Sequence, residues 1–414
     1  MNQPFRRVFF AFVATIACSV CAAAPSGSDT AWIGSWATAQ QIPEPRNALP
    51  AGALHDATLR QIVRVSVGGP ALRVRLSNAF GTEPLHVLAA HIARPLREDT
   101  IDPATDHALT FNGHADVVIP AGAEMTSDAL AVAIASLSSL AISVRIEDQP
   151  GQQTGHPGSR ATSYVATGIP AAARELRGAT SVDHWYFIAG IEVSTPTPAS
   201  SVAVLGDSIT DGHGATTNGN DRWPDVLAER LQRSPTHRTI GVLNAGIGGN
   251  RLLLDGLGPN ALARFDRDVL ARAGVRHLIV LEGINDLGML THDGPVSAQR
   301  HEDLVHGMIG VYREMITRAH AHGIKVLGAT LLPFGGNDFY HPDAANERDR
   351  QAINAWIREP GHFDAVVDFD RILADPQHPD RLNEAYDSGD HLHPSPAGYR
   401  KMGESVPLEF LSDR

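Results

Sequence analysis

The stretch Val202–Gly214 reads VAVLGDSITDGHG and decides how the second half of the chain is interpreted. Its four leading apolar residues run directly into the turn Gly206-Asp207-Ser208 and then into further glycine and polar residues. An apolar run that stops in a glycine turn predicts a buried parallel strand whose carboxyl end presents the Ser208 hydroxyl. Ligands bind at this edge of open α/β sheets. Taken alone, Ser208 is either a turn residue or a nucleophile.

Beyond this stretch, strand and helix patterns alternate to the end of the chain. The expected strands are Val202–Leu205, Thr239–Leu243, His277–Leu281, Lys325–Thr330 and Ala365–Phe369. The expected helices are Trp223–Gln232, Ala261–Ala273, Ser297–His322, Glu347–Arg358 and a final helix that starts at Ser395-Pro396. Such alternation predicts an α/β domain, in which helices cover both faces of a parallel sheet.

The first half of the chain follows a period of two instead. Its short apolar or alternating runs are Thr58–Ser66, Leu72–Asn78, Val87–Arg94, Ala115–Ile119, Leu130–Ile134, Leu140–Ile146 and Trp185–Val193. Glycine- and proline-containing turns separate these runs, and no long helical pattern interrupts them. Short strands with regular turn signals predict an antiparallel β sandwich. The proline-rich stretch STPTPAS at 194–200 marks the junction between the two halves.

The N-terminus has the pattern of a secretory signal peptide. Arg6 and Arg7 precede an apolar run, Val8–Val20, and the small residues of Cys21-Ala22-Ala23-Ala24 form a cleavage zone. We therefore expect a signal peptide at 1–24, a β-sandwich accessory domain at 25–194, a linker at 195–200 and the α/β domain at 201–414. The expected location is secreted or periplasmic.

The chain's 2 cysteines both lie inside this N-terminal segment. An acylated Cys18 is the alternative to cleavage near residue 24, but the preceding Thr15-Ile16-Ala17 is a weak lipidation signal. After cleavage the protein contains no thiol, so cysteine catalysis, thiolate metal sites and disulfides are excluded.

Charge and composition exclude several classes of partner. The 414 residues include 34 Lys and Arg against 46 Asp and Glu, a net charge of −12, with no basic run. Such a chain is a poor binder of nucleic acid and of anionic membrane surfaces. The N-terminal apolar run is shorter than the ~20 residues that span a bilayer, and no later segment qualifies, so stable membrane insertion is not expected.

Four short polar segments follow predicted strands or precede predicted helices in the second half. They are Gly206–Thr210 (GDSIT), Asn244–Arg251 (NAGIGGNR), Gly283–Asp286 (GIND) and Asp390–Pro394 (DHLHP). Ester hydrolysis needs a serine, a base within reach and a partner that orients the base. Asp390 and His393 are three residues apart, so the carboxylate can hold an imidazole that faces Ser208. The backbone N–H groups of Ser208 and Gly249 and the side-chain amide of Asn285 can supply the donors that a developing oxyanion needs.

These four segments, in this order, resemble the conserved blocks of the SGNH (GDSL-type) hydrolase superfamily over roughly residues 201–409. The resemblance implies that Ser208 is the nucleophile, that His393 is the base and that Asp390 is its partner. It also implies an oxyanion hole made of Ser208, Gly249 and Asn285, and a three-layer α/β/α domain with a five-stranded parallel sheet. Ile209 stands where many members have leucine, an apolar exchange that changes none of these roles.

A finer resemblance extends over the whole chain. WIGSWATAQ, RQIVRVSVGG, RLSNAFGTEPL and TLLPFGG are similar to secreted bacterial two-part members of the superfamily, some of which are acetyl esterases acting on xylan. We therefore expect a secreted serine esterase for short acyl esters, with acetylated polysaccharide or a small-molecule ester as substrate. A lipase-like or aryl esterase for longer acyl chains is the alternative, and a non-catalytic carbohydrate-binding protein is a remote one.

Several side chains are candidates for contact with substrate. Asp211 and Asn220, close to Ser208 in sequence, either bind substrate or brace the loop, and Asp207 is expected to bond nearby backbone. Aromatic and sulfur side chains that follow strands are candidates to line an acyl or sugar pocket, namely Trp223, Met289, Phe334, Phe339 and Tyr340. For Trp223, packing in the core is the alternative. The tryptophans of the first half, Trp32, Trp36 and Trp185, are expected to be core or interface residues rather than sugar platforms.

Other chemistries fit the sequence less well. His391 and His393 alternate in an extended segment and point to opposite faces, so no metal site is expected there. Gly246-Ile247-Gly248 has Arg251 where a dinucleotide loop needs its third glycine, and no serine has the GxSxG pattern of α/β-hydrolases. We expect no metal and no organic cofactor.

Overall fold

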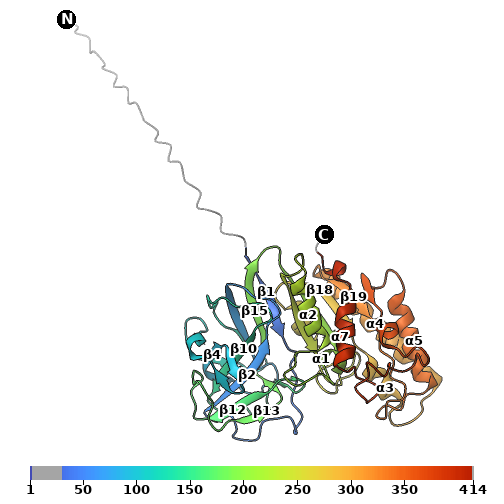
Figure 1. The fold of residues 1–414 in the computed structure, drawn as a ribbon, viewed down its shortest axis with the longest axis horizontal. Helices are drawn as coiled ribbons and strands as arrows, with labels where there is room; N and C mark the ends of the chain where they lie inside the picture. Colours follow the sequence, from blue (N-terminus) through green and yellow to red (C-terminus); the bar gives the residue numbers. More distant parts are fainter. Residues whose placement is uncertain (2–29, 413–414) are drawn as a thin grey trace.

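The computed structural model describes residue 1 and residues 30–412. The predicted signal peptide therefore lies, apart from Met1, outside the described residues, as do Cys18 and Cys21. An antiparallel β-rich part built from the first half of the chain stands beside an α/β part built from the second (Figure 1). Of the helices in residues 30–412, none combines the length and the apolar character needed to cross a bilayer.

The β-rich part contains two main sheets in which every pairing is antiparallel. In spatial order, the first consists of β1 (Thr30–Ala37), β15 (Ile188–Pro196), β3 (Ala71–Ser77) and β9 (Glu124–Thr126). The second runs β13 (Thr180–Val182), β12 (Ser163–Thr167), β2 (Ala57–Arg64), β10 (Ser139–Ile146), β4 (Leu85–Ala93) and β7 (His107–Leu109), with β8 (Val117–Ile119) also paired to β4. The smaller elements are the strand pairs β5 (Pro95–Arg97) with β6 (Thr100–Ile101) and β11 (Gly155–His156) with β14 (Trp185–Tyr186), and the 3₁₀ turn η1 (Pro103–Thr105).

Both main sheets contribute to one hydrophobic cluster, which confirms the predicted sandwich. Alternate residues of β10 and β3, such as Ile142 and Val74, point into this cluster and are fully buried. Trp36 and Trp185 are buried and meet edge to face, with ring centroids 4.9 Å apart, so they are core residues as expected. The predicted strand Leu130–Ile134 is wrong: it makes only isolated bridges, from Leu130 to Leu72 in β3 and from Ile134 to Gly69 just before β3.

The α/β part is built on a five-stranded parallel sheet. In spatial order its strands are β17 (Ile240–Gly246), β16 (Ser200–Gly206), β18 (Val275–Leu281), β19 (Lys325–Ala329) and β20 (Ala365–Val367). The chain therefore crosses from one side of β16 to the other after β17. Such a reversal of strand order is where open α/β sheets bind ligands, just beyond the carboxyl ends of the strands.

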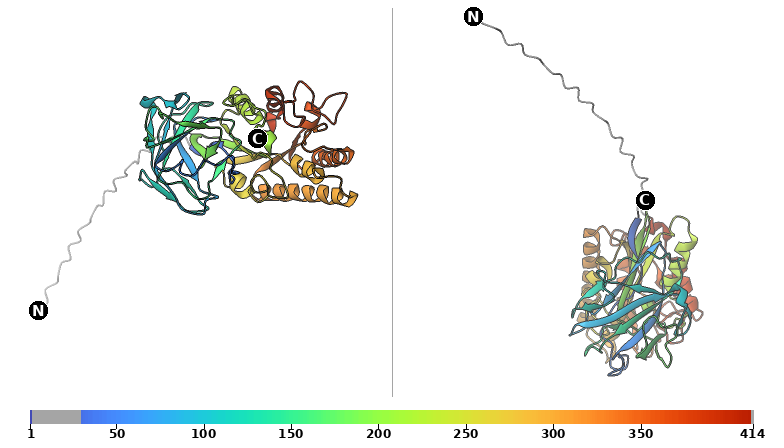
Figure 2. Two further views of the ribbon diagram at one scale, coloured as in Figure 1. Left: turned by 90° about the horizontal axis from the view of Figure 1, so that it is seen from below. Right: turned by 90° about the vertical axis from the view of Figure 1, so that its left-hand side faces the viewer.

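Helices cover both faces of this sheet (Figure 2). They are α1 (Ser208–Asp211), α2 (Trp223–Arg233), α3 (Ile284–Thr291), α4 (Ala298–Ala321), α5 (Ala344–Arg358), α6 (Phe369–Leu373) and α7 (Pro396–Ser405), with the 3₁₀ turn η3 (Leu408–Leu411). Helix α2 packs against α7, and α4 packs against α5. Ser395 caps α7 as its sequence predicts, because its side chain accepts a hydrogen bond from the backbone N–H of Gly398.

The predicted helix Ala261–Ala273 is wrong in extent. The structure forms only the π-helical turn η2 (Asp266–Leu270) within it. Arg264 and Asp268 of this segment are almost fully buried, and Arg264 donates hydrogen bonds to the carbonyls of Gly206 and Ala245 at the ends of β16 and β17. Ala261, Phe265 and Val269 of the segment are buried in the core, but Arg264 and Asp268 are buried as well, so the segment has no polar face turned to solvent as an amphipathic surface helix would.

The two parts meet along β1 and β17, where the backbones approach closely. The backbone N–H of Gly34 donates to the carbonyl of Ala273 over 2.9 Å, and the Ser201 hydroxyl donates to the carbonyl of Gly34 over 2.9 Å. A Cβ atom on Gly241 would lie only 1.9 Å from the carbonyl oxygen of Gly34, so this contact requires glycine. The β-rich part is thus held against the sheet that carries Ser208.

Candidate active site

Ser208 lies at the first residue of α1, directly beyond the carboxyl end of β16. Asp207 caps this helix: its side chain accepts a hydrogen bond from the backbone N–H of Ile209 over 2.9 Å, the structural role expected for it. A Cβ atom on Gly206 would lie 2.3 Å from the Thr210 hydroxyl oxygen, so the turn from strand to helix needs glycine at this position. The Ser208 residue is 7% exposed, and its hydroxyl borders a cavity.

Ser208, His393 and Asp390 form one hydrogen-bonded chain. The distance from Ser208 Oγ to His393 Nε2 is 2.8 Å, and His393 Nδ1 lies 2.6 Å from Asp390 Oδ2. Since the carboxylate can only accept when ionised, the proton belongs on Nδ1 of His393, and Nε2 is left to accept the proton of Ser208. This is the arrangement of a nucleophile, a base and an orienting carboxylate.

Asp390 keeps its negative charge while it is hydrogen-bonded to His393. Partial burial by itself raises the pKa of Asp390, but the hydrogen bond and charge of His393 and two backbone N–H groups outweigh burial and hold the pKa well below its usual range. Those N–H groups belong to His393 and Leu392, at 2.8 and 3.0 Å from Asp390 Oδ1. An ionised partner stabilises the imidazolium that forms when His393 takes a proton.

Gly249 and Asn285 border the same cavity as Ser208 and His393, a space of about 540 Å³. Gly249 has φ 71°, and a Cβ atom there would lie 2.7 Å from Leu257 Cδ1. Asn285 lies in the first turn of α3, where its Nδ2 donates to the carbonyl of Asn250 over 2.7 Å. One N–H of the Asn285 amide remains for a ligand, so the predicted oxyanion donors are brought together at one cavity.

Two further side chains, to which the sequence analysis gave no role, support the site: Asp286 acts near the oxyanion donors and Asn337 at Asp390. The Asp286 carboxylate accepts from the backbone N–H groups of Leu252 and Leu253, at 2.8 and 3.1 Å, and so anchors the chain just after the Gly249 turn. Burial raises the pKa of Asp286 to about 6. Asn337 donates to the carbonyl of Asp390 over 2.8 Å. Asp286 lies within the GIND segment, and Asn337 lies in the glycine-containing stretch 335–338, but neither pattern indicates these hydrogen bonds.

The structure corrects part of the predicted substrate contacts. Trp223 is fully buried and packs edge to face against Phe369, and Phe334 is 1% exposed, so both belong to the core beneath the sheet edge. Tyr340 and Phe339 do border the cavity, and Phe339 is 56% exposed, whereas Met289 is exposed and does not border it. Apolar side chains that follow strands fill the core unless the chain turns outward, which the sequence pattern does not reveal.

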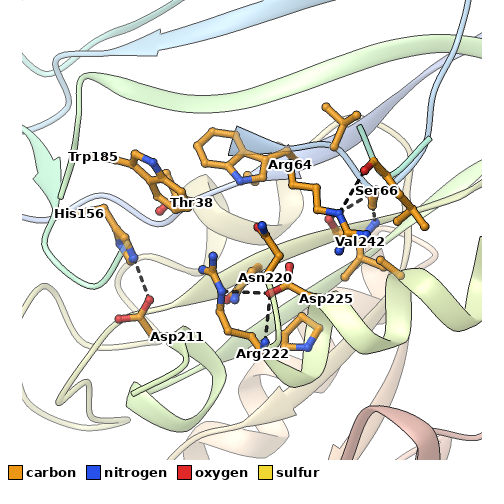
Figure 3. A pocket seen from close by; sticks show the side chains of 17 residues that line it. Thr38, Arg64, Ser66, His156, Trp185, Asp211, Asn220, Arg222, Asp225 and Val242 are labelled. Carbon is orange, nitrogen blue, oxygen red and sulfur yellow. Dashed lines mark hydrogen bonds and ion pairs between the residues drawn. The ribbon is translucent and has the colours of Figure 1, made fainter. Parts of the chain in front are cut away.

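Asp211 and Asn220 do not border the cavity of Ser208. Both line a separate space of about 30 Å³ between the two parts of the chain (Figure 3). Asp211 is 1% exposed, and its Oδ2 accepts a hydrogen bond from the backbone N–H of Gly248 over 3.1 Å. Of the two roles open for Asp211, binding substrate or bracing a loop, the structure therefore supports the second.

A second imidazole, which the sequence analysis missed, lies against the hydrogen-bonded chain. The rings of His213 and His393 are 4.1 Å apart, and His213 Nε2 lies 3.9 Å from Asp390 Oδ2. Arg160, from the β-rich part, donates to His213 Nδ1 over 3.2 Å. Burial, followed by the charges of His393 and Arg160, lowers the pKa of His213 to about 4. His213 is thus a neutral ring whose Nε2–H faces Asp390.

The three side chains of His213, Asp390 and His393 place their ligand atoms within 4.8 Å of one another, close enough to hold a metal ion. Hydrogen bonds within the protein already assign other roles to the ring nitrogens of the two histidines. His213 Nδ1 accepts from Arg160, which leaves the ring proton on Nε2, and both nitrogens of His393 are engaged with Ser208 and Asp390. A metal ion here would have to displace the contact between His393 and Asp390.

Residues 204–401 match the profile of the GDSL-like Lipase/Acylhydrolase family. No curated protein sequence matches the chain. Among solved structures, a GDSL-like lipase from Bacteroides thetaiotaomicron is 19% identical and aligns over 51% of this chain and 88% of its own, with a TM-score of 0.37. Est24, a carbohydrate acetylesterase from Sinorhizobium meliloti, is 15% identical and aligns over 51% of this chain and 98% of its own, with a TM-score of 0.39.

Proposed function

We propose, from the premise that residues 204–401 belong to the GDSL-like lipase/acylhydrolase family, that this protein is a serine esterase whose nucleophile is Ser208. The observation that carries the proposal is the continuous contact from Ser208 Oγ through His393 to Asp390, at 2.8 and 2.6 Å. Gly249 and Asn285 border the same open cavity. Nucleophile, base, orienting carboxylate and oxyanion donors are what acyl transfer to water requires.

The proposed reaction has two halves. Ser208 Oγ attacks the ester carbonyl while its proton moves to His393 Nε2, and the N–H groups of Ser208, Gly249 and Asn285 bind the oxyanion. The tetrahedral intermediate collapses, the carbon–oxygen bond to the alcohol breaks, and His393 gives its proton to the departing alkoxide. A water molecule then attacks the acyl-enzyme, and His393 takes its proton before returning it to Ser208 as the carboxylic acid leaves.

The favoured substrates are short acyl esters of a polar alcohol, with acetylated polysaccharide such as xylan as the leading candidate. The wall of the cavity supports this, because Arg46, Asn337, Asp338 and His391 are among the residues that line it. Core packing of Phe334 and Trp223 removes two of the apolar side chains that a deep acyl pocket would need. The predicted export signal at 1–24 supports a substrate outside the cytoplasm.

A lipase-like or aryl esterase is the second candidate, and the exposed apolar side chains at the cavity favour it. Phe339 is 56% exposed and Leu257 is 38% exposed, and both border the space next to Gly249. An aromatic or longer aliphatic group would find contact there.

Hydrolysis of a series of esters separates these candidates. Acetyl, butyryl and octanoyl esters of one alcohol are compared with acetate release from acetylated xylan, with Ser208→Ala as the blank. Preference for acetyl and release of acetate support the first candidate; preference for octanoyl without acetate release supports the second. Equal hydrolysis by wild type and Ser208→Ala in clean protein contradicts both, and favours a carbohydrate-binding role.

A further inference from the structure

His156, a buried histidine of the β-rich part, contacts Asp211 of the α/β part, and Asp211 in turn binds the turn that contains Gly248 and Gly249. His156 Nε2 lies 2.8 Å from Asp211 Oδ1, and the two side chains are 3% and 2% exposed. Figure 3 shows this pair at the seam between the two parts. His156 belongs to β11, and the ring of Trp185, from the paired strand β14, stacks on it with centroids 5.8 Å apart. The imidazole is therefore held firmly in place.

The hydrogen-bond partners of His156 define where the protons lie in its contact with Asp211. His156 Nδ1 faces the carbonyl oxygen of Ala39 over 2.9 Å, so Nδ1 carries a proton. A further proton must lie between Nε2 and Asp211 Oδ1, because both atoms would otherwise be acceptors. Whichever of the two holds it, the contact is a direct hydrogen bond in a buried environment, where such bonds are strong and their loss is costly.

Asp211 connects His156 to both sides of the proposed oxyanion hole. Its backbone N–H donates to the carbonyl of Asp207 over 2.8 Å, within the helical turn that begins at Ser208. Its Oδ2 accepts from the backbone N–H of Gly248, the residue before Gly249, over 3.1 Å. Asp211 thus joins the turn of Ser208, through its backbone N–H, to the turn of Gly248 and Gly249, through Oδ2, and His156 binds its other carboxylate oxygen, Oδ1.

The surroundings of Asp211 leave its carboxylate little freedom. Gly158, in the same segment as His156, lies so close that a Cβ atom there would be 1.7 Å from Asp211 Oδ2. The space at the seam measures about 30 Å³, enough for one or two water molecules and too small for a substrate. These residues therefore serve the contact between the two parts instead of a separate ligand.

We propose that His156 is a positioning residue for catalysis, which fixes the Gly248–Gly249 turn of the oxyanion hole through Asp211. The inference rests on the proposed esterase function. It assigns the β-rich part a role in the chemistry although His156 does not touch the substrate. A misplaced oxyanion donor weakens binding of the transition state more than binding of the ester, so the effect falls on kcat and leaves KM nearly unchanged.

Steady-state kinetics of seam variants test this proposal. His156→Ala and Asp211→Ala are expected to lower kcat by about 10- to 100-fold with KM within about 3-fold of wild type. Asp211→Asn is expected to keep most of the activity: the amide oxygen still accepts from Gly248, and the amide N–H donates to a neutral His156. Inhibition by a boronic acid, whose adduct on Ser208 places an oxygen in the oxyanion hole, is expected to weaken in parallel with kcat.

Two further variants keep the test decisive. Gly158→Ala adds one methyl group against the Asp211 carboxylate, and the same loss of kcat is expected even if His156→Ala fails to fold. Ser66→Ala is the matched control, because Ser66 is buried at the seam and bonds Val242 over 2.9 Å without contacting the glycine turn. It is expected to lower the unfolding temperature and to leave kcat unchanged.

The outcomes separate the two proposals. An inactive wild-type enzyme, or activity that survives Ser208→Ala, overturns the esterase function itself. An active wild type whose folded His156→Ala and Gly158→Ala variants keep the parental kcat overturns the positioning role alone. A rise in KM without loss of kcat also overturns it, since that result would mean a change in substrate binding.

Discussion

The hydroxyl of Tyr340 donates a hydrogen bond to the side-chain oxygen of Asn285, with 2.5 Å between the two oxygen atoms. A hydroxyl donor on one side and the carbonyl of Asn250 on the other determine which end of the amide is nitrogen. Burial raises the pKa of Tyr340 well above its ordinary value, so its hydroxyl keeps its proton over the working pH range. Tyr340 therefore aims the Asn285 N–H at the cavity.

Loss of this hydrogen bond is expected to be a smaller defect than loss of the amide. Tyr340→Phe should lower kcat by about 3- to 10-fold, the value of one neutral hydrogen bond. Asn285→Ala should lower it by about 10²- to 10³-fold, as removal of an oxyanion donor does. Steady-state kinetics on one acetyl ester measure both, and an Asn285→Ala enzyme with parental turnover would contradict its assigned role.

Asp390→Asn is expected to lower kcat by about 10²- to 10⁴-fold with the fold intact. The amide cannot hold the proton on His393 Nδ1 in the way that the ionised carboxylate does. The measurement compares kcat and the thermal unfolding temperature of the two proteins. Activity within a few-fold of wild type would show that His393 does not depend on this partner.

Stability at alkaline pH is expected to be limited by a buried carboxyl group. Burial, reinforced by the charge of Asp207, raises the pKa of Glu282 well above its ordinary value. Above the pH at which Glu282 ionises in the unfolded chain, the native state holds more protons than the unfolded state, so stability falls as pH rises toward the native pKa. Burial likewise raises the pKa of Asp207 to about 7, with the same sign.

Glu282→Gln removes one of these titrating groups. Its free energy of unfolding, measured with urea, is expected to be close to wild type near about pH 5 and higher than wild type near about pH 8. Parallel pH curves for the two proteins would show that Glu282 does not titrate in this window.

Substitution of two aromatic residues named by the sequence analysis is expected to affect different properties: stability for Trp223 and substrate binding for Phe339. Trp223→Ala should destabilise the protein by about 3–5 kcal/mol, since Trp223 is fully buried in the core. Phe339→Ala should leave stability within about 0.5 kcal/mol and change KM for esters with longer acyl chains, since Phe339 is exposed at the cavity. Urea unfolding and the acyl-chain series test both, and a marginal effect of Trp223→Ala would contradict its core position.

Local patterns predicted most of the architecture. The period of two before residue 194 and the alternation of strand and helix after residue 201 indicated the antiparallel and parallel sheets, because one side chain in two, or one helical face, has to be buried. The prediction failed at Ala261–Ala273, where Arg264 and Asp268 are buried as a charged pair with an N···O distance of 3.1 Å. Hydrophobic periodicity carries no information about such a pair.

The sequence by itself determined the four segments of the site and their order, since a strand end, a glycine turn and an Asp-x-x-His spacing are each written within a few consecutive residues. Only the tertiary structure decided which distant side chains support them. His156 and Asp211 are 55 positions apart, and so are Asn285 and Tyr340. Hydrogen bonds over such separations exist only after the distant segments have packed together, because their geometry depends on the whole fold and leaves no local pattern in the chain.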